Sequence, residues 1–308
     1  MTSKQIKSSL LLFLAAFIWG TAFVAQSQGG SLMGAYTYNG IRNLLGALVL
    51  VPAIRFFDAK GMTARRPVTA EDKRQLFKAG IVCGIALFAG STLQQIGLNL
   101  GADTGRAGFI TATYIIMVPI LGIFLKRKCG INIWIGAVIA LIGLYLLCAM
   151  NGFSLKSCDL ALIAGAIGFT FQITFLDIYT CQVDPVRLSQ IEFIVTGIIS
   201  IVPIVFYDIP QAGGISAWLA CFTTAGAWGS LLYASVLSSG VAYTLQAVSQ
   251  AELDPTLASM IMSLESVFSA ISGALILGQY LTGRETLGCI LIFAAIIIAQ
   301  LPNPLASK

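Results

Sequence analysis

The chain has 308 residues, of which 57% are hydrophobic and only 10% are charged. A soluble protein of this size carries about 25% charged residues, because it must cover a surface that faces water. With a mean hydropathy of +0.88, the sequence predicts an all-α polytopic membrane protein and excludes an ordinary soluble domain.

Apolar stretches of roughly 18 to 25 residues recur along the chain, the length that a helix needs to cross about 30 Å of hydrocarbon. The segment 208–227 fits either a short interfacial piece or the start of the eighth span. The first apolar run resembles a signal peptide, but no small-x-small cleavage site follows it, so we interpret it as a spanning helix. We expect ten transmembrane helices near 9–26, 35–57, 77–99, 104–125, 131–150, 159–180, 186–207, 228–250, 255–278 and 284–301.

Basic residues are distributed unevenly between the connections. The first and third connections contain neither lysine nor arginine, whereas the N-terminal tail and the second and fourth connections are basic. In the second half, Arg187 and Lys308 fall on this basic side, and Lys156 and Arg284 on the other. The positive-inside rule then predicts that both termini are cytoplasmic, in an inner (plasma) membrane of the prokaryotic type. The net charge of +5 is thereby explained by orientation in a lipid bilayer, with no nucleic-acid partner. The basic residues on which this depends are Lys4, Lys7, Arg55, Lys60, Arg65, Arg66, Lys73, Arg74, Lys78, Lys126, Arg127 and Lys128.

The sequence also contains an internal repeat. Residues 92–147 can be laid on 244–299 without a gap, which aligns one "TLQ" tripeptide with another and brings the apolar runs into register. Chance similarity between apolar helices is the alternative explanation. Because each half would hold five spans, an odd number, the second copy must enter the membrane upside down. We therefore expect two inverted five-helix repeats, residues 1–150 and 151–308.

Three stretches resemble a known family. "AAFIWGTAFVA" resembles the first helix of the EamA-type branch of the drug/metabolite transporter (DMT) superfamily, and "TATYIIMVPILGIFLKRK" resembles the end of its fourth. The run from "SSGVAYTLQAVSQAELDP" through "TLASMIMSLESVFSAISGALIL" to "LIFAAIII" resembles the C-terminal signature. Where the family usually has Glu-Pro in helix nine, Ser266 follows Glu265 here. The resemblance implies ten helices in two inverted five-helix repeats and solute export or exchange by alternating access. Members handle amino acids, other small metabolites and sugar conjugates.

Charged side chains within the spans are the first candidates for a binding site. A charge at the bilayer centre costs about 2.5–3.5 kcal/mol on insertion scales, so it usually faces the protein interior or a water-filled cavity. Glu265 lies about ten residues into the ninth span and either contacts substrate, holds Arg42 or fixes helix packing. Arg42, with Asn39 on the same face of span two, either pairs with Glu265, binds a substrate carboxylate or snorkels toward the outer surface. Glu192, about two turns inside span seven, is a second acid whose role stays open.

Neutral polar and aromatic residues complete the candidate set. Gln94 and Gln246 occupy matching places in the repeat, and Tyr243 shares one face of span eight with Gln246. Such faces suit hydrogen bonding to a zwitterion, but they also hold helices together. Tyr114 and Trp19 either line an aromatic cavity or pack in the core. The predicted substrate-binding residues are Glu265, Arg42, Asn39, Gln94, Tyr114, Gln246, Tyr243 and Trp19.

The residue types present disfavour other classes of protein. Histidine is absent and the seven cysteines contain no CxxC pair, so we expect no metal site and no cofactor. No nucleophile with a base and no paired carboxylates appear at suitable spacing, which disfavours a membrane enzyme. The longest polar connection, 58–76, is too short for an output domain.

We therefore expect a secondary transporter that exports or exchanges small polar or amphipathic metabolites, such as amino acids, by alternating access around a central cavity. The alternative is a non-transporting membrane scaffold or sensor protein. The fifth and tenth spans, the most uniformly apolar, are expected at the periphery of a monomer or at the contact of a homodimer.

Overall fold

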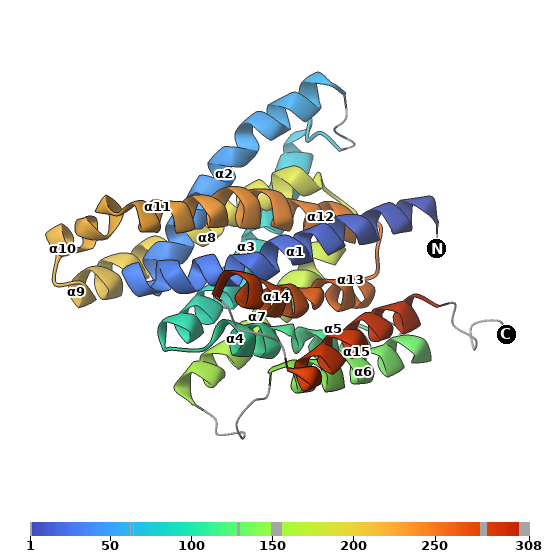
Figure 1. Ribbon diagram of the computed structural model, residues 1–308. Coiled ribbons are helices and arrows are strands. Elements are labelled where there is room, and N and C mark those ends of the chain that lie inside the picture. Colours follow the sequence, from blue (N-terminus) through green and yellow to red (C-terminus); the bar gives the residue numbers. More distant parts are fainter. Residues whose placement is uncertain are drawn as a thin grey trace.

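The computed structural model describes residues 2–61, 63, 65–127, 130–148, 156–277 and 282–301, and regular structure within these ranges is helical (Figure 1). The expected boundary between the halves, at residues 150 and 151, lies outside the described residues, as do Lys128 and Lys308. The helical elements are α1 (Ser3–Leu32), α2 (Ala35–Ala59), α3 (Ala70–Asn99), α4 (Thr104–Ala112), α5 (Tyr114–Phe124), α6 (Ile131–Cys148), α7 (Ser157–Thr180), α8 (Pro185–Pro203), η1 (Ile204–Asp208), α9 (Ile209–Gln211), α10 (Ile215–Ala220), η2 (Cys221–Thr223), α11 (Ala225–Leu232), η3 (Tyr233–Tyr243), α12 (Thr244–Gln250), α13 (Pro255–Met262), α14 (Leu264–Leu277) and α15 (Gly283–Gln300).

The expectation of an all-α membrane protein is confirmed. In the described part of the chain, eight helical segments are long and apolar enough to cross a membrane, and they coincide with eight of the ten expected spans. Two shorter apolar stretches, Ile131–Leu146 and Thr286–Ala299, lie where the fifth and tenth spans were expected. Several helices extend beyond the apolar segments, because polar residues such as Thr2 and Thr69 cap their first turns.

The segment 208–227 forms a separate short helical piece. The seventh span continues through η1 and α9 to Gln211, and α10 and η2 then precede the cap of α11 at Thr224. Gly213 and Gly214 join α9 to α10 with φ angles of 91° and 112°, a region that residues with a Cβ rarely adopt. In Figure 1, α9 and α10 lie at the end of the molecule opposite the N-terminus.

Two of the long segments are interrupted at comparable places. The fourth breaks at Thr113, between α4 and α5, and the ninth breaks at Ser263, between α13 and α14. At each break the hydroxyl donates to the carbonyl three residues earlier, at 2.5 Å for Thr113 and 2.7 Å for Ser263. The break in the ninth segment therefore forms without the proline that the family usually has there. Tyr114 is the first residue of α5 and Glu265 is the second residue of α14, so both lie in the first turn of a new half-helix.

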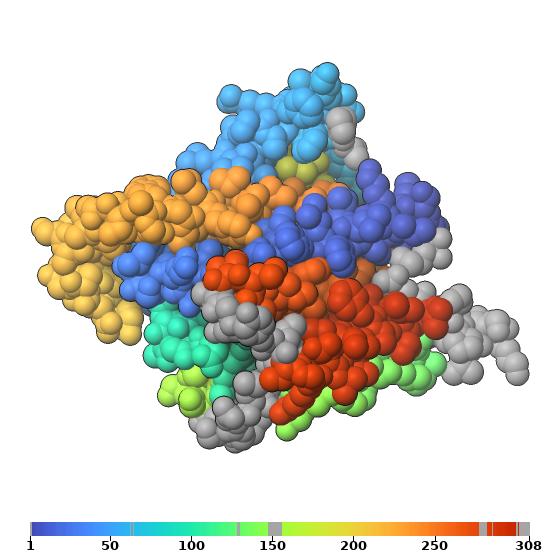
Figure 2. All heavy atoms as spheres, in the orientation of Figure 1, coloured from blue at the N-terminus to red at the C-terminus, as the bar shows by residue number. Residues whose placement is uncertain are grey.

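Helices of the two halves pack in a pattern that is unchanged when the halves are exchanged. α2 packs on α8, α4 on α14 and α6 on α15, while the contact of α1 with η3 and α12 corresponds to that of α3 with α7. Figure 2 shows α1 enclosed between the 225–250 segment and α14. These contacts are close: a Cβ added at Gly168 of α7 would lie 2.7 Å from the Cα of Gly90 in α3.

Candidate functional site

Polar residues from both halves converge on one internal cavity. Its free volume is about 30 Å³, enough for water-sized molecules. Apolar walls come from Phe23, Phe169, Ile173 and Met262. Seven of the eight predicted substrate-binding residues line the cavity, namely Trp19, Arg42, Gln94, Tyr114, Tyr243, Gln246 and Glu265.

Asn39 is the predicted residue that does not line this cavity. Its Nδ2 donates to Thr92 Oγ1 at 2.7 Å, and its Oδ1 accepts from Asn43 Nδ2 at 3.1 Å. Because both ends of the amide are bonded to protein groups, Asn39 holds α2 against α3. Sequence spacing placed it on the face of Arg42, but spacing alone does not separate a helix contact from a cavity wall.

Glu265 is positioned by the two broken segments. The Tyr114 hydroxyl, at the start of α5, donates to Glu265 Oε1 over 3.0 Å. On the other side, Gly20 lets α1 approach so closely that an added Cβ would lie 2.7 Å from the Glu265 carbonyl oxygen. Glu265 is 5% exposed, so its carboxyl group is held at a fixed place on the cavity wall.

Arg42 is buried in the same cavity without a carboxylate partner. The side chain is 2% exposed, and it forms no ion pair with any carboxylate in the described ranges. Its neighbour is Tyr243, which lies within electrostatic range of Arg42, Glu192 and Glu265 and packs edge-on to Trp19 with ring centroids 4.8 Å apart. Glu265 and Arg42 therefore form no direct ion pair in this structure: the Tyr114 hydroxyl bonds the carboxyl group, and the Tyr243 side chain neighbours the cation.

Four of the lining residues carry a buried polar atom that lacks a hydrogen-bond partner among the described residues. These atoms are two donors, Trp19 Nε1 and Arg42 Nε, and two acceptors, Gln26 Oε1 and Gln246 Oε1. Leaving a buried polar group unpaired costs about 1–3 kcal/mol. Four such atoms around one cavity indicate a place that water or a polar solute occupies.

Several lining residues were not among the sequence candidates. Gln26 follows Trp19 and Phe23 at helical spacing, so the face of span one that carries Trp19 contained the signal. Gln172 is a lone amide in the otherwise apolar segment "GFTFQITF", which is as typical of helix packing as of a site. Apolar and small lining residues, such as Phe169 and Ser238, carry no sequence signal at all.

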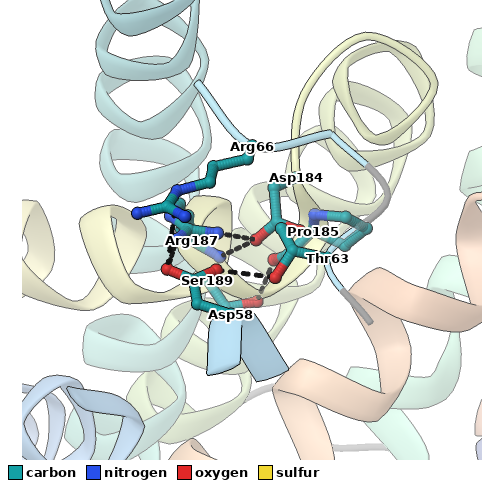
Figure 3. Close-up of polar contacts among 7 residues, drawn as sticks. All are labelled: Asp58, Thr63, Arg66, Asp184, Pro185, Arg187 and Ser189. Atoms are coloured by element: carbon teal, nitrogen blue, oxygen red, sulfur yellow. Dashed lines mark hydrogen bonds and ion pairs between the residues drawn. The ribbon is translucent and has the colours of Figure 1, made fainter. Parts of the chain in front are cut away.

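An ion-pair cluster lies where α2 ends and α8 begins (Figure 3). Arg187 contacts Asp58 at 2.5 Å and Asp184 at 3.5 Å, and Thr63 donates to Asp58 at 2.7 Å. Asp184 also accepts from the backbone N–H of Arg187 and so caps α8. Burial raises the pKa of the Asp184 carboxyl, although its hydrogen bonds and charge contact with Arg187 act in the opposite direction.

At the other end of α2, uncharged donor groups of Thr37 bond the carboxylate of Asp208 and so join α2 to η1. The backbone N–H and the hydroxyl of Thr37 donate to Asp208 Oδ2 at 2.6 and 2.7 Å, and Trp218 Nε1 donates to Thr37 Oγ1 at 3.0 Å. A hollow of about 470 Å³ lies beside this contact, bordered by the ends of α1, α2 and α3 and by α10. Gln95 Nε2 donates to the Gln26 backbone carbonyl at 3.1 Å and to Asn99 Oδ1 at 2.9 Å. These bonds join α1 to α3 beside the hollow, which Asn99 borders.

The all-helical fold and the internal polar cavity define the class of protein as an integral membrane protein of transporter type. Comparison with known proteins agrees with this class. The EamA-like transporter family matches residues 6–149 and again residues 156–300. The chain belongs to the EamA-like transporter family, as the sequence resemblance indicated.

Curated relatives carry the same general description. A protein of Archaeoglobus fulgidus described as an uncharacterized transporter is 27% identical over 304 residues, covering 97% of this chain and 87% of its own length. The uncharacterized transporter sll0355 of Synechocystis sp. is 24% identical over 311 residues, covering 93% and 88%. One solved crystal structure superposes with a TM-score of 0.76 at 18% identity, covering 98% of this chain and 99% of that one. It shares the fold.

Proposed function

We propose that the protein is a secondary transporter that exports or exchanges small polar or amphipathic metabolites, amino acids being the favoured class, by alternating access. The observation that carries this proposal is the separate placement of Arg42 and Glu265 on one cavity. A buried cation without a carboxylate partner suits a substrate carboxylate, and a carboxylate elsewhere on the wall suits a substrate ammonium. The aromatic and aliphatic wall residues suit the apolar part of such a solute.

The small size of the cavity and the contacts at both ends of α2 support alternating access. A volume of about 30 Å³ is too small for a metabolite, so the surrounding helices must separate before a substrate binds. The Asp208–Thr37 contact holds α2 at one end, and the Asp58–Arg187 cluster holds it at the other. Interrupted helices beside the site, here α4–α5 and α13–α14, are common in secondary transporters.

The topology is part of the same proposal. We infer ten spans with both termini in the cytoplasm of a prokaryotic-type inner membrane, α6 and α15 completing the eight longer segments. The two inverted repeats would be residues 1–150 and 151–308. The exchange symmetry of helix packing and the two separate matches to one family support them. The peripheral α6–α15 pair would face lipid in a monomer or meet its copy in a homodimer.

Counterflow in proteoliposomes tests the transport function. Purified protein is reconstituted with an internal pool of unlabelled amino acids, and uptake of each labelled amino acid is followed. We expect exchange of one chemical class, and its loss in Glu265→Gln with normal membrane insertion. Gln190→Met is the matched control, because Gln190 bonds the Ala47 carbonyl and is not among the lining residues. Failure of every amino acid and of further small-metabolite pools to exchange would instead favour a scaffold or sensor.

A further inference from the structure

Three side-chain amides form a connected chain at one wall of the cavity, which Gln172 and Gln246 line. Gln246 Nε2 donates to Gln250 Oε1 at 2.9 Å and to Gln172 Oε1 at 3.1 Å, linking α12 to α7. Gln250 Nε2 donates to the Ile173 carbonyl at 3.0 Å, and Gln172 Nε2 donates to Glu192 Oε1 at 2.9 Å. The three amides and Glu192 are each 1% exposed, so water does not compete for these bonds.

The direction of every bond in this chain is fixed from one end. A backbone carbonyl can only accept, so Gln250 must turn its NH₂ toward Ile173 and its oxygen toward Gln246. Gln246 must then present its NH₂ to that oxygen, and the same NH₂ meets the oxygen of Gln172. Reversing any single amide would place two acceptors or two donors together. Amide orientation is assigned from such networks, and here the network allows one arrangement.

The consequence is an unpartnered acceptor of fixed orientation on a residue that lines the cavity. Both bonds of Gln246 to its neighbours use Nε2, so its Oε1 is left without a partner among the described residues. Gln246 lines the cavity together with Glu265 and with Gln26, whose Oε1 is also unpartnered. This acceptor set contrasts with the donors of Arg42 and Trp19 on the same cavity.

We propose that Gln246 Oε1 is a specificity-determining acceptor for a nitrogen donor of the substrate, a primary ammonium or amine. Gln172 and Gln250 are positioning residues, held by Glu192 and the Ile173 carbonyl, that keep the oxygen of Gln246 toward the cavity. This inference rests on the proposed function for the existence of a substrate, and it adds a second residue, beside Glu265, that recognises the amino group of that substrate. A solute without an N–H donor leaves the Gln246 oxygen buried and unpaired, so it binds more weakly.

Binding measurements test the inference independently of transport. Isothermal titration calorimetry on the purified full-length protein compares L-alanine, L-leucine and L-phenylalanine with propionate, 4-methylpentanoate and 3-phenylpropionate, which lack only the amino group. We expect at least one amino acid to bind roughly tenfold or more tightly than its partner acid, the ratio that one hydrogen bond to a charged group provides. The double variant Gln172→Met/Gln250→Met frees the Gln246 amide to turn, and Gln246→Leu removes it. Both should lower the ratio at least threefold from its wild-type value, and Glu265 accounts for the selectivity that remains.

Gln190→Met should keep the wild-type ratio, because that amide lies outside the chain. A purely structural role of the amides would weaken both members of a pair equally and leave the ratio unchanged, which would overturn the inference. Equal binding of both members by the wild-type protein, or binding of none of the six probes, would also overturn it. Selective amine binding without counterflow would contradict the transport proposal alone. Counterflow of the amino acids and their partner acids at equal rates would support transport and contradict the amine selectivity.

Discussion

Replacing Gly20 by alanine tests whether the approach of α1 to α14 positions Glu265. An added Cβ would lie 2.7 Å from the Glu265 carbonyl oxygen and 2.8 Å from the Ser269 backbone nitrogen. Ordinary contact begins at 3.4 Å, so clearing these two atoms alone requires the α14 backbone to move away from α1 by about 0.7 Å. The Cβ of Phe268 lies closer still to the added Cβ, so the full displacement is larger. Neither atom can rotate aside, because both belong to a hydrogen-bonded helix backbone.

The expected cost follows from overpacking, which destabilises a tightly packed interior by about 1–3 kcal/mol. Gly20→Ala should therefore lower the melting temperature of the purified protein in detergent. It should also weaken binding of the amino acid that the calorimetry identifies, since Glu265 moves with α14. Gly229→Ala is the matched control: Gly229 is also helical, but no atom lies within 4 Å of its added Cβ. If Gly20→Ala melts and binds like Gly229→Ala, the contact does not hold Glu265 in place.

Three further variants test other contacts. Tyr114→Phe removes the donor to Glu265 and should weaken amino-acid binding about tenfold to a hundredfold by calorimetry. Adding Glu265→Gln to this variant should cause little further loss. Independent losses from the two changes would contradict the contact. Arg42→Met should abolish counterflow without rescue by Glu265→Gln, because the two side chains form no ion pair; partial rescue would restore that hypothesis. Asp58→Asn weakens the ion-pair cluster around Arg187, so it should increase maleimide labelling of Ser189→Cys in a cysteine-free background. Unchanged labelling would show that the cluster does not hold the Asp58 end of α2 closed.

Much of the cavity could be predicted because apolar spans make polar residues conspicuous. Glu265, Arg42 and Gln246 stand out in their segments, since each costs free energy in lipid unless it faces the interior. The sequence could not distinguish Asn39, whose amide is consumed by Thr92, from residues that keep an unpartnered atom. Whether a polar side chain finds a bonding partner depends on the residues of the adjacent helix. The spacing of residues within one helix gives no information about that partner.

The relation between Arg42 and Glu265 was beyond sequence reasoning for a similar reason. Opposite charges in the same membrane suggest a pair, but their separation is set by how α2 and α14 are placed around Tyr243 and Tyr114. The interruption of the ninth span was also hidden. The expected proline is absent, and the break instead uses a serine hydroxyl that bonds a carbonyl three residues earlier. Serine occurs often enough in spanning helices that Ser263 alone gave no warning.

The contacts at the two ends of α2, with α8 at Asp58 and with η1 at Asp208, differ in the free energy needed to separate them. One end of the protein should therefore open more easily than the other in the proposed cycle. At the Figure 3 end, the Arg187 and Asp58 side chains are 14% and 19% exposed, so water can replace much of their contact and the pair contributes little to holding this end closed. At the other end, Asp208 is 5% exposed and accepts two short bonds from Thr37. Separating a buried carboxylate from its donors costs about 1.5–3 kcal/mol for each bond. The Asp58–Arg187 end of α2 should therefore open more readily than the Asp208 end, and opening the Asp208 end requires that a substrate or another contact offset the loss there.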